Sequence, residues 1–391
     1  MSAERQNLNW LSVQYRSFMI LGLDIGATRR EDFIKSLRKL LFYTICMVTM
    51  QYGFINFVIH SITNIDSITS SLSMFNQGVL LLFKGTMIIY KRASMLDLIW
   101  NLNYLAKKAS EEEYGLWVSE NRRGELIAKA YLYACWISMT CVAIIPWIFV
   151  VYEWFQGLEM HLNLPFELMF PYDDGGWLAS MANYVLTMLH IRGLANTSIG
   201  IDTLFGWYIH AIVGHFRILR YKIKKAALRI DLHEDHSQFV QDIGDFVEYH
   251  KKVLQYVEDL NRLYGAMSWA EITMSCLQLC FLLYSLANDP NFASIPFHFV
   301  ASASITLQLT IYCIGGEKIK NENDMLCDEI YMAMPWEKMN PSEKKLILIP
   351  LIRAQKQTLL KGLFFYLNQS LLVFIFKNAF SFITLLGAMK E

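Results

Sequence analysis

Seven long apolar stretches, separated by charged segments, constrain this chain more than any other feature of its sequence. Each stretch reaches the roughly 20 residues that cross a bilayer as a helix. They lie at Lys39–Ile59, Ile68–Tyr90, Leu126–Tyr152, Trp177–Ile212, Gly265–Ala287, Ile295–Gly316 and Leu363–Leu386. Only 18% of the 391 residues are charged, against about a quarter in soluble proteins. The sequence therefore predicts an all-α fold, a bundle of seven transmembrane helices in a lipid bilayer.

The distribution of basic residues predicts the orientation of this bundle. Lys and Arg precede the first stretch and follow the second, fourth and sixth, whereas the connecting segments 61–67, 153–176 and 288–294 contain neither. Because cytoplasmic loops carry the excess of Lys and Arg, we expect a cytoplasmic N-terminus and an extracellular C-terminus. This topology is inverted relative to a G-protein-coupled receptor. Epitope tags at both termini would distinguish the two.

Four regions follow from this topology. Residues 1–38 form a cytoplasmic segment whose apolar residues, from Leu11 to Met19, have helical spacing and lie on the bilayer face or against the bundle. Residues 39–316 hold spans one to six, with two helical extensions into the cytoplasm across 213–264, one ending near Ile230 and one starting at Ser237. Residues 317–362 form a cytoplasmic anchor, with a helix over 322–333 and a second run from Ser342 into the last span, 363–391.

Motifs of enzymes and metal sites are missing from the sequence. It has no phosphate-binding glycine loop, no HExxH and no GxSxG, so we expect neither an enzyme nor a cofactor. His233 and His236 share a polar turn without further ligands, which indicates a solvated turn rather than a metal site. A net charge of zero argues against nucleic acid as a partner. A membrane transporter is an alternative, because charged residues lie within the apolar stretches at Arg192, Asp202 and Glu271. The lack of an internal repeat between the two halves of the chain argues against it.

A stripe of large and small residues on the third span predicts a ligand pocket in the outer half of the bundle. Trp136, Met139, Thr140, Ala143 and Trp147 follow helical spacing. At comparable depth the neighbouring spans offer Ser71, Met74, Phe75, Met181, Tyr184, Val185, Met188 and Gln278. Walls rich in Met and aromatic residues suit small, mostly apolar ligands. The alternative for each of these residues is ordinary core packing.

The last span carries a second stripe, in which polar residues give way to an aliphatic one. At 100° per residue Phe374, Asn378, Ser381 and Leu385 share one narrow face. Such a face either hydrogen-bonds to neighbouring helices or lines a water path with an apolar constriction. With the C-terminus outside, Leu385 lies near the outer mouth and Lys377 borders an inner vestibule. One helix cannot enclose a pore, so the second interpretation requires an oligomer.

Three segments near the C-terminus resemble the insect odorant receptor family. The run from Asn323 to Trp336 has the family's polar pair, apolar helix, Tyr and following Trp, and the run from Leu346 to Lys356 ends in a similar Arg-Ala-Gln-Lys. Phe376-Lys-Asn-Ala-Phe-Ser-Phe-Ile-Thr-Leu-Leu386 is similar to the family's terminal motif, with Phe380 and Phe382 where Tyr is usual. The motifs cover the last quarter of the chain.

This resemblance implies an odorant-sensing subunit of a ligand-gated, non-selective cation channel in the plasma membrane of olfactory neuron dendrites. It implies a tetramer with the family's co-receptor around a pore lined by the seventh span, with volatile odorants and permeant cations as partners. In the family's pattern the constriction falls on Leu385, and Met389 flanks it. The co-receptor's long second cytoplasmic insertion has no room between Leu232 and Gln238. Gustatory-type channels, the remaining alternative, end in a different motif.

Overall fold

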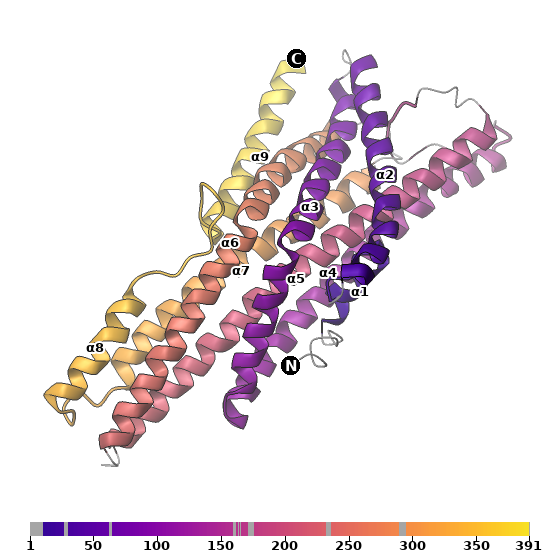
Figure 1. Cartoon of the computed structure of the whole chain (residues 1–391). Helices are drawn as coiled ribbons and strands as arrows, with labels where there is room; N and C mark the ends of the chain where they lie inside the picture. Colours follow the sequence, from indigo (N-terminus) through magenta and orange to yellow (C-terminus); the bar gives the residue numbers. More distant parts are fainter. Residues whose placement is uncertain are drawn as a thin grey trace.

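The chain folds into a bundle of long helices, as the sequence predicts (Figure 1). The computed structural model describes residues 11–26, 30–61, 65–158, 162, 164, 166–170, 176–231, 236–288 and 295–390. Within these residues nine helices account for nearly all regular structure. They are α1 (Ser12–Leu21), α2 (Arg30–His60), α3 (Ile65–Lys107), α4 (Glu111–Phe155), α5 (Trp177–Asp231), α6 (His236–Asn288), α7 (Ile295–Ala333), α8 (Pro341–Gln355) and α9 (Gln369–Lys390).

Five of the helices are long and apolar enough to cross a membrane by length and composition. These segments are Leu37–His60, Ser71–Lys107, Glu111–Phe155, Ser237–Ala287 and Ile295–Ala333. Four of them contain a predicted span, and Ser71–Lys107 overlaps the predicted span Ile68–Tyr90 from Ser71 onward. Helix α5 contains the fourth predicted span but also Arg192, Asp202 and a strongly charged second half. The seventh predicted span corresponds to the shorter apolar helix Gln369–Leu385.

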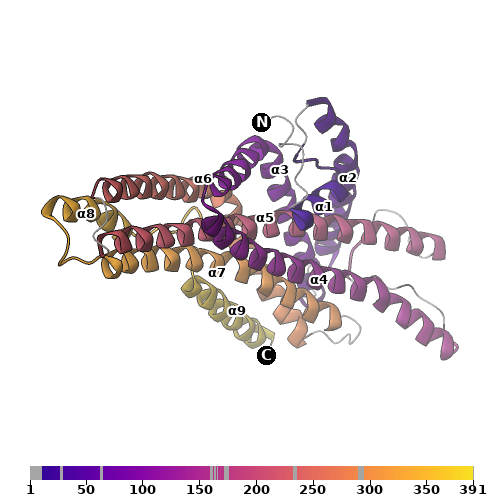
Figure 2. The same cartoon turned by 90° about the horizontal axis from the view of Figure 1, so that it is seen from below.

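Beyond the predicted spans, α4, α5, α6 and α7 continue as one packed extension, with α8 beside α6 and α7 (Figures 1 and 2). Helix α5 ends at Asp231 and α6 begins at His236, close to the predicted Ile230 and Ser237. The turn with His233 lies outside the described residues. Ion pairs join the extensions: Arg217 Nη1 lies 2.7 Å from Glu120 Oε2, and Arg220 Nε lies 2.5 Å from Glu329 Oε2.

Glu120 is the most enclosed acid of this extension. Burial raises its pKa, but hydrogen bonds from His210 and Lys318 outweigh burial and hold the pKa at about 2. A buried carboxylate with several cationic partners stays ionised and ties the helices that supply them. Glu120 therefore links α4 to α5 and α7.

The segment before α9 differs from the prediction. Helix α8 stops at Gln355 instead of running on, and α9 begins at Gln369 rather than at Leu363. Between them the chain turns back on itself: Gly362 N donates to Phe365 O at 2.8 Å, and Leu367 N donates to Leu360 O at 2.9 Å. Asn368 Oδ1 then accepts the Leu371 N–H at 2.8 Å and caps α9. The apolar run Leu363–Leu367 gave no signal for this turn.

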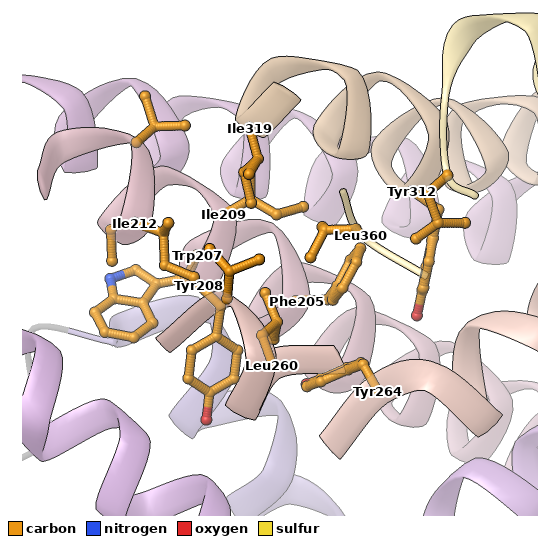
Figure 3. Packing of buried hydrophobic residues seen from close by; sticks show 14 of the residues in the cluster. Phe205, Trp207, Tyr208, Ile209, Ile212, Leu260, Tyr264, Tyr312, Ile319 and Leu360 are labelled. Atoms are coloured by element: carbon orange, nitrogen blue, oxygen red, sulfur yellow. The ribbon is translucent and has the colours of Figure 1, made fainter. Parts of the chain in front are cut away.

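Helix α5 lies at the centre of the bundle and carries much of its aromatic core (Figure 3). The ring of Phe205 stacks on Tyr312 of α7 at 4.4 Å between centroids and tilts against Tyr264 of α6 at 4.9 Å. Tyr208 donates a hydrogen bond to the Met95 carbonyl of α3 at 2.8 Å. Buried aromatic pairs of this kind stabilise a core beyond their apolar area. They hold α3, α5, α6 and α7 together below the candidate site.

Candidate functional site

A cavity of about 140 Å³ opens between α3, α4, α5, α6 and α7, below the segment that joins α4 to α5. Met74, Val142, Phe166, Phe297 and Ile305 are among its apolar lining residues. The Phe166 and Phe297 rings lie 5.9 Å apart between centroids. The aromatic and aliphatic residues form an apolar wall, which excludes water and suits an apolar ligand.

The α4–α5 segment reaches the cavity because three hydrogen bonds hold it down on α2 and α3. Ser71 Oγ donates to the Glu167 carbonyl at 2.5 Å. Met169 N donates to the Gly53 carbonyl at 3.2 Å, and Asn56 Nδ2 donates to the Met169 carbonyl at 3.3 Å. These bonds place Phe166 against Phe54, with 5.4 Å between ring centroids. The segment thus covers the cavity with a buried aromatic side chain.

The opposite end of the cavity is polar. Ser198 and Gln308 line it, and both donate to Asp202, from Ser198 Oγ at 2.7 Å and from Gln308 Nε2 at 2.6 Å. Tyr131, which also lines the cavity, shares a 2.8 Å hydrogen bond with Ser198. Tyr312 donates to the other oxygen of Asp202 at 2.8 Å. Polar atoms from α4, α5 and α7 therefore converge at this end of the cavity.

A fully buried lysine connects this polar end to α6. Lys84 Nζ of α3 lies 2.7 Å from Asp202 Oδ1, and it also contacts Glu271 of α6. All three side chains are inaccessible to solvent. Ser275 donates to Glu271 Oε1 at 2.9 Å. Charges in such an interior persist only when they are paired and hydrogen-bonded, so the network fixes α3, α5 and α6 relative to one another.

Three of the predicted ligand residues line the cavity: Met74, Met139 and Gln278. Several of the others make contacts of their own. Tyr184 donates to the Ala143 carbonyl at 2.7 Å and packs edge-on against Trp147, and Thr140 donates to the Trp136 carbonyl at 2.8 Å. Outside the lining, Ser71 is buried, Phe75, Met181 and Met188 are half-buried, and Trp136 and Val185 are more than half exposed.

The predicted stripe from Trp136 to Trp147, which lies on α4, thus faces the outer surface of the bundle as much as its interior. Trp136 is 54% exposed, whereas Tyr131 and Val142 on the same helix are buried and line the cavity. Helical spacing tells which residues share a face but not which way the face points. In a membrane protein the lipid-facing side is as apolar as the core. Sequence reasoning missed Ser198 and Gln308, although both are polar residues within apolar helices.

Helix α9 lies against α6 and α7 with its two faces clearly separated. Ile375 and Ala379 are buried, and Phe382 packs edge-on against Phe281 of α6 at 6.3 Å. The predicted stripe faces away from the bundle: Asn378, Ser381 and Leu385 are exposed, Leu385 by 60%. Lys377 is exposed beside it, and Asn378 Nδ2 donates to the Phe374 carbonyl at 3.0 Å. The side chain of Met389 lies outside the described residues.

Comparison with known families gives one match over most of the chain. The family model described as 7tm Odorant receptor matches residues 64–380. Among curated Drosophila melanogaster proteins, Odorant receptor 45a is 24% identical and covers 98% of this chain and 99% of its own length. Odorant receptor 47a is 25% identical and covers 98% of this chain and all of its own length.

Solved structures show the same fold. The insect olfactory receptor OR5 from Machilis hrabei in complex with eugenol superposes with a TM-score of 0.81 at 15% identity, over 97% of this chain and 98% of that one. The structure of the same receptor described without eugenol gives a TM-score of 0.73 at 14% identity, over 97% of both chains. The likeness therefore extends over the whole bundle.

Proposed function

The chain belongs to the insect odorant receptor family, and from that premise we propose that it is the odorant-binding subunit of a ligand-gated, non-selective cation channel. As a member of this family it is a membrane-embedded, odorant-sensing receptor and not an enzyme. The channel activity, the assembly with a co-receptor in a tetramer and the plasma membrane of sensory dendrites are parts of the proposal. A cytoplasmic N-terminus, predicted from the basic residues, belongs to it as well.

The observation that carries the ligand assignment is the two-ended cavity. Its apolar end is lined by Phe166, Phe297 and Val142, and its polar end by Ser198 and Gln308. A cavity of about 150 Å³ binds benzene in other proteins, so about 140 Å³ suits a ligand of roughly six to ten heavy atoms. The favoured ligand has an apolar body and one hydroxyl or carbonyl group. At roughly 0.5–0.8 kcal/mol per atom, the affinity of a ten-atom ligand is micromolar.

The pore assignment rests on the outward stripe of α9. A single chain leaves Asn378, Ser381 and Leu385 uncovered, as expected of a surface that faces the same helix of neighbouring subunits. In that arrangement Leu385 forms an apolar ring that dewets and closes the path. Polar Asn378 and Ser381 then line the wider part, with Lys377 at its border. Met389 remains a predicted neighbour of the constriction.

The test is co-expression with the family's co-receptor in oocytes and a screen of volatile compounds. We expect odorant-evoked, non-selective cation current that requires both proteins. Leu385→Ala should raise the basal current because a smaller side chain lowers the cost of wetting the constriction. The exposed Leu348 of α8 gives a matched control, Leu348→Ala, with unchanged basal current. Surface-delivered receptor without any evoked current across a broad panel would contradict the proposal.

A further inference from the structure

A second, larger recess lies where α1, α2 and α5 meet, away from the cavity that we propose binds the odorant. Its volume is about 640 Å³, and it shares no lining residue with the odorant cavity. Four cationic side chains and four apolar or aromatic ones line it: Arg16, Arg38, Lys39, Arg192, Met19, Ile20, Phe42 and Tyr43. We call it the basic groove. Nothing in the odorant-sensing mechanism uses it.

Close helix packing forms the walls of the basic groove. Helix α1 lies across α5, where Gln14 Nε2 donates to the Thr203 carbonyl at 3.1 Å and a Cβ on Gly200 would lie only 3.0 Å from Phe18. Helix α2 meets α5 where a Cβ on Gly193 would lie 3.3 Å from the Tyr43 ring. These contacts fix the positions of α1, α2 and α5 relative to one another, so helix packing determines the shape of the groove.

The cations of the groove have no acidic neighbour among its lining residues. In the part of the chain that the structure describes, Arg16, Arg38, Lys39 and Arg192 make no ion pair, whereas Arg217 and Arg220 pair with Glu120, Glu322 and Glu329. Four like charges around one recess repel one another. An anion that enters the groove relieves this repulsion, and guanidinium groups bind phosphate through paired hydrogen bonds.

The apolar surface next to the groove indicates where the anion comes from. Above Lys39, helix α2 exposes a continuous apolar face that includes Leu41, Ile45, Val48 and Ile59, each more than half exposed. From Lys39 to Ile59 the helix rises about 30 Å at 1.5 Å per residue, which is the hydrocarbon thickness of a bilayer. The groove therefore lies at one membrane interface, with a lipid-facing helix surface leading out of it.

We propose that the basic groove binds the headgroup of a phosphoinositide, an anionic phospholipid of the cytoplasmic leaflet. Its phosphates lie among Arg16, Arg38, Lys39 and Arg192, and an acyl chain follows Phe42 and Ile45 along α2. The recess is far larger than one phosphate group, and four cations suit a polyanionic headgroup better than a singly charged one. Basic pockets between membrane helices on the cytoplasmic side bind such headgroups in other proteins.

The test is direct binding of a fluorescent short-chain phosphatidylinositol bisphosphate to the purified full-length receptor in detergent, which needs no odorant response. Because each Lys or Arg near an anionic surface is worth about fivefold in binding, Arg16→Gln/Arg38→Gln/Arg192→Gln should bind about 100-fold more weakly. Lys225→Gln/Lys251→Gln/Lys345→Gln removes the same charge from exposed positions outside the groove and should bind normally. Arg192→Lys keeps the charge and should retain binding within about twofold.

Further binding measurements distinguish a phosphoinositide from other ligands of the groove. Saturable binding with at least tenfold preference over phosphatidylserine and phosphatidylcholine supports the proposal, and equal affinity for phosphatidylcholine overturns it. Soluble inositol trisphosphate that binds as tightly as the lipid overturns the lipid assignment. If the triple variant does not stay monodisperse on size exclusion, Arg38→Gln alone decides: about fivefold weaker binding supports the groove, and unchanged binding refutes it.

Discussion

Replacing Lys84 with Met tests whether the buried charge network holds the bundle together. Lys84 is inaccessible to solvent and compensates two carboxylates, those of Asp202 and Glu271. Met has a similar length without the charge, so Lys84→Met leaves both acids unpaired in an apolar interior. Removal of one partner of a buried pair costs about 3–5 kcal/mol. At about 2 °C per kcal/mol for a large domain, the apparent melting temperature should fall by about 6–10 °C.

The network holds two carboxylates for one lysine. Asp202 accepts hydrogen bonds from Ser198, Gln308 and Tyr312, whereas Glu271 accepts one from Ser275 besides its contact with Lys84. Lys84 and Asp202 form a neutral pair, so Glu271→Gln removes the surplus charge and should shift the melting temperature by less than about 3 °C. Lys84→Met/Asp202→Asn/Glu271→Gln should recover most of the stability lost in Lys84→Met.

The assay is fluorescence-detected size exclusion after heating, with each variant in the same detergent. Lys129→Met, at an exposed lysine whose only described ion pair is with Glu125, is the matched control and should melt like the parent protein, since exposed pairs contribute little. A Lys84→Met protein that melts within 2 °C of the parent would refute the reasoning. If Glu271→Gln lowers the melting temperature as much as Lys84→Met does, Glu271 is not the surplus charge and the prediction is wrong.

Three further predictions address ligand recognition, gating and pH. Gln308→Leu should weaken responses to ligands with a hydroxyl or carbonyl by about fivefold to tenfold and leave those to hydrocarbons of equal length within twofold; dose–response currents measure this, with the outward-facing Trp136→Phe as control. Phe281→Ala should lower the maximal odorant current while direct ligand binding stays within twofold, because it removes an α6–α9 contact; an equal loss of binding would contradict it. Burial lowers the pKa of His215 from 6.5 to about 3. As the pH falls from 6.5 to 3, the unfolded chain takes up a proton at this histidine that the folded chain does not. The free energy of unfolding should therefore fall by up to about 1.4 kcal/mol for each unit by which the pH is lowered in that window. His215→Asn should show a shallower loss in melting experiments, and identical pH profiles would contradict this.

Helix existence and extent were readable from the sequence because long apolar runs have few alternatives in a membrane protein. The extensions of α5 to Asp231 and α6 from His236 followed from charged, proline-free periodicity. The turn before α9 was not readable, since Leu363–Leu367 is apolar in either conformation. Only the Asn368 cap marks the true start of that helix.

The lining of the cavity was only partly predictable, for a related reason. Met74, Met139 and Gln278, predicted as ligand residues, line the cavity, whereas Trp136 and Val185 are more than half exposed. Hydropathy cannot separate lipid-facing from core-facing positions when both sides are apolar. The polar residues within the spans were the better guide, because Ser198, Asp202 and Gln308 must find partners inside the bundle. Their mutual hydrogen bonds locate the floor of the cavity.

Helix α6 connects the proposed odorant cavity with α9, the proposed pore-lining helix. Gln278 lines the cavity, Glu271 two turns away contacts Lys84, and Phe281 meets Phe382 of α9. A ligand changes an equilibrium only through different affinities for its two states. A ligand that contacts Gln278 can favour one position of α6 over another. A small movement of α6 then reaches α9 through the Phe281–Phe382 pair. The buried charges resist such movement at their own depth because separating them is costly. A pivot near Glu271, with larger displacement near Phe281, is the motion that this arrangement permits.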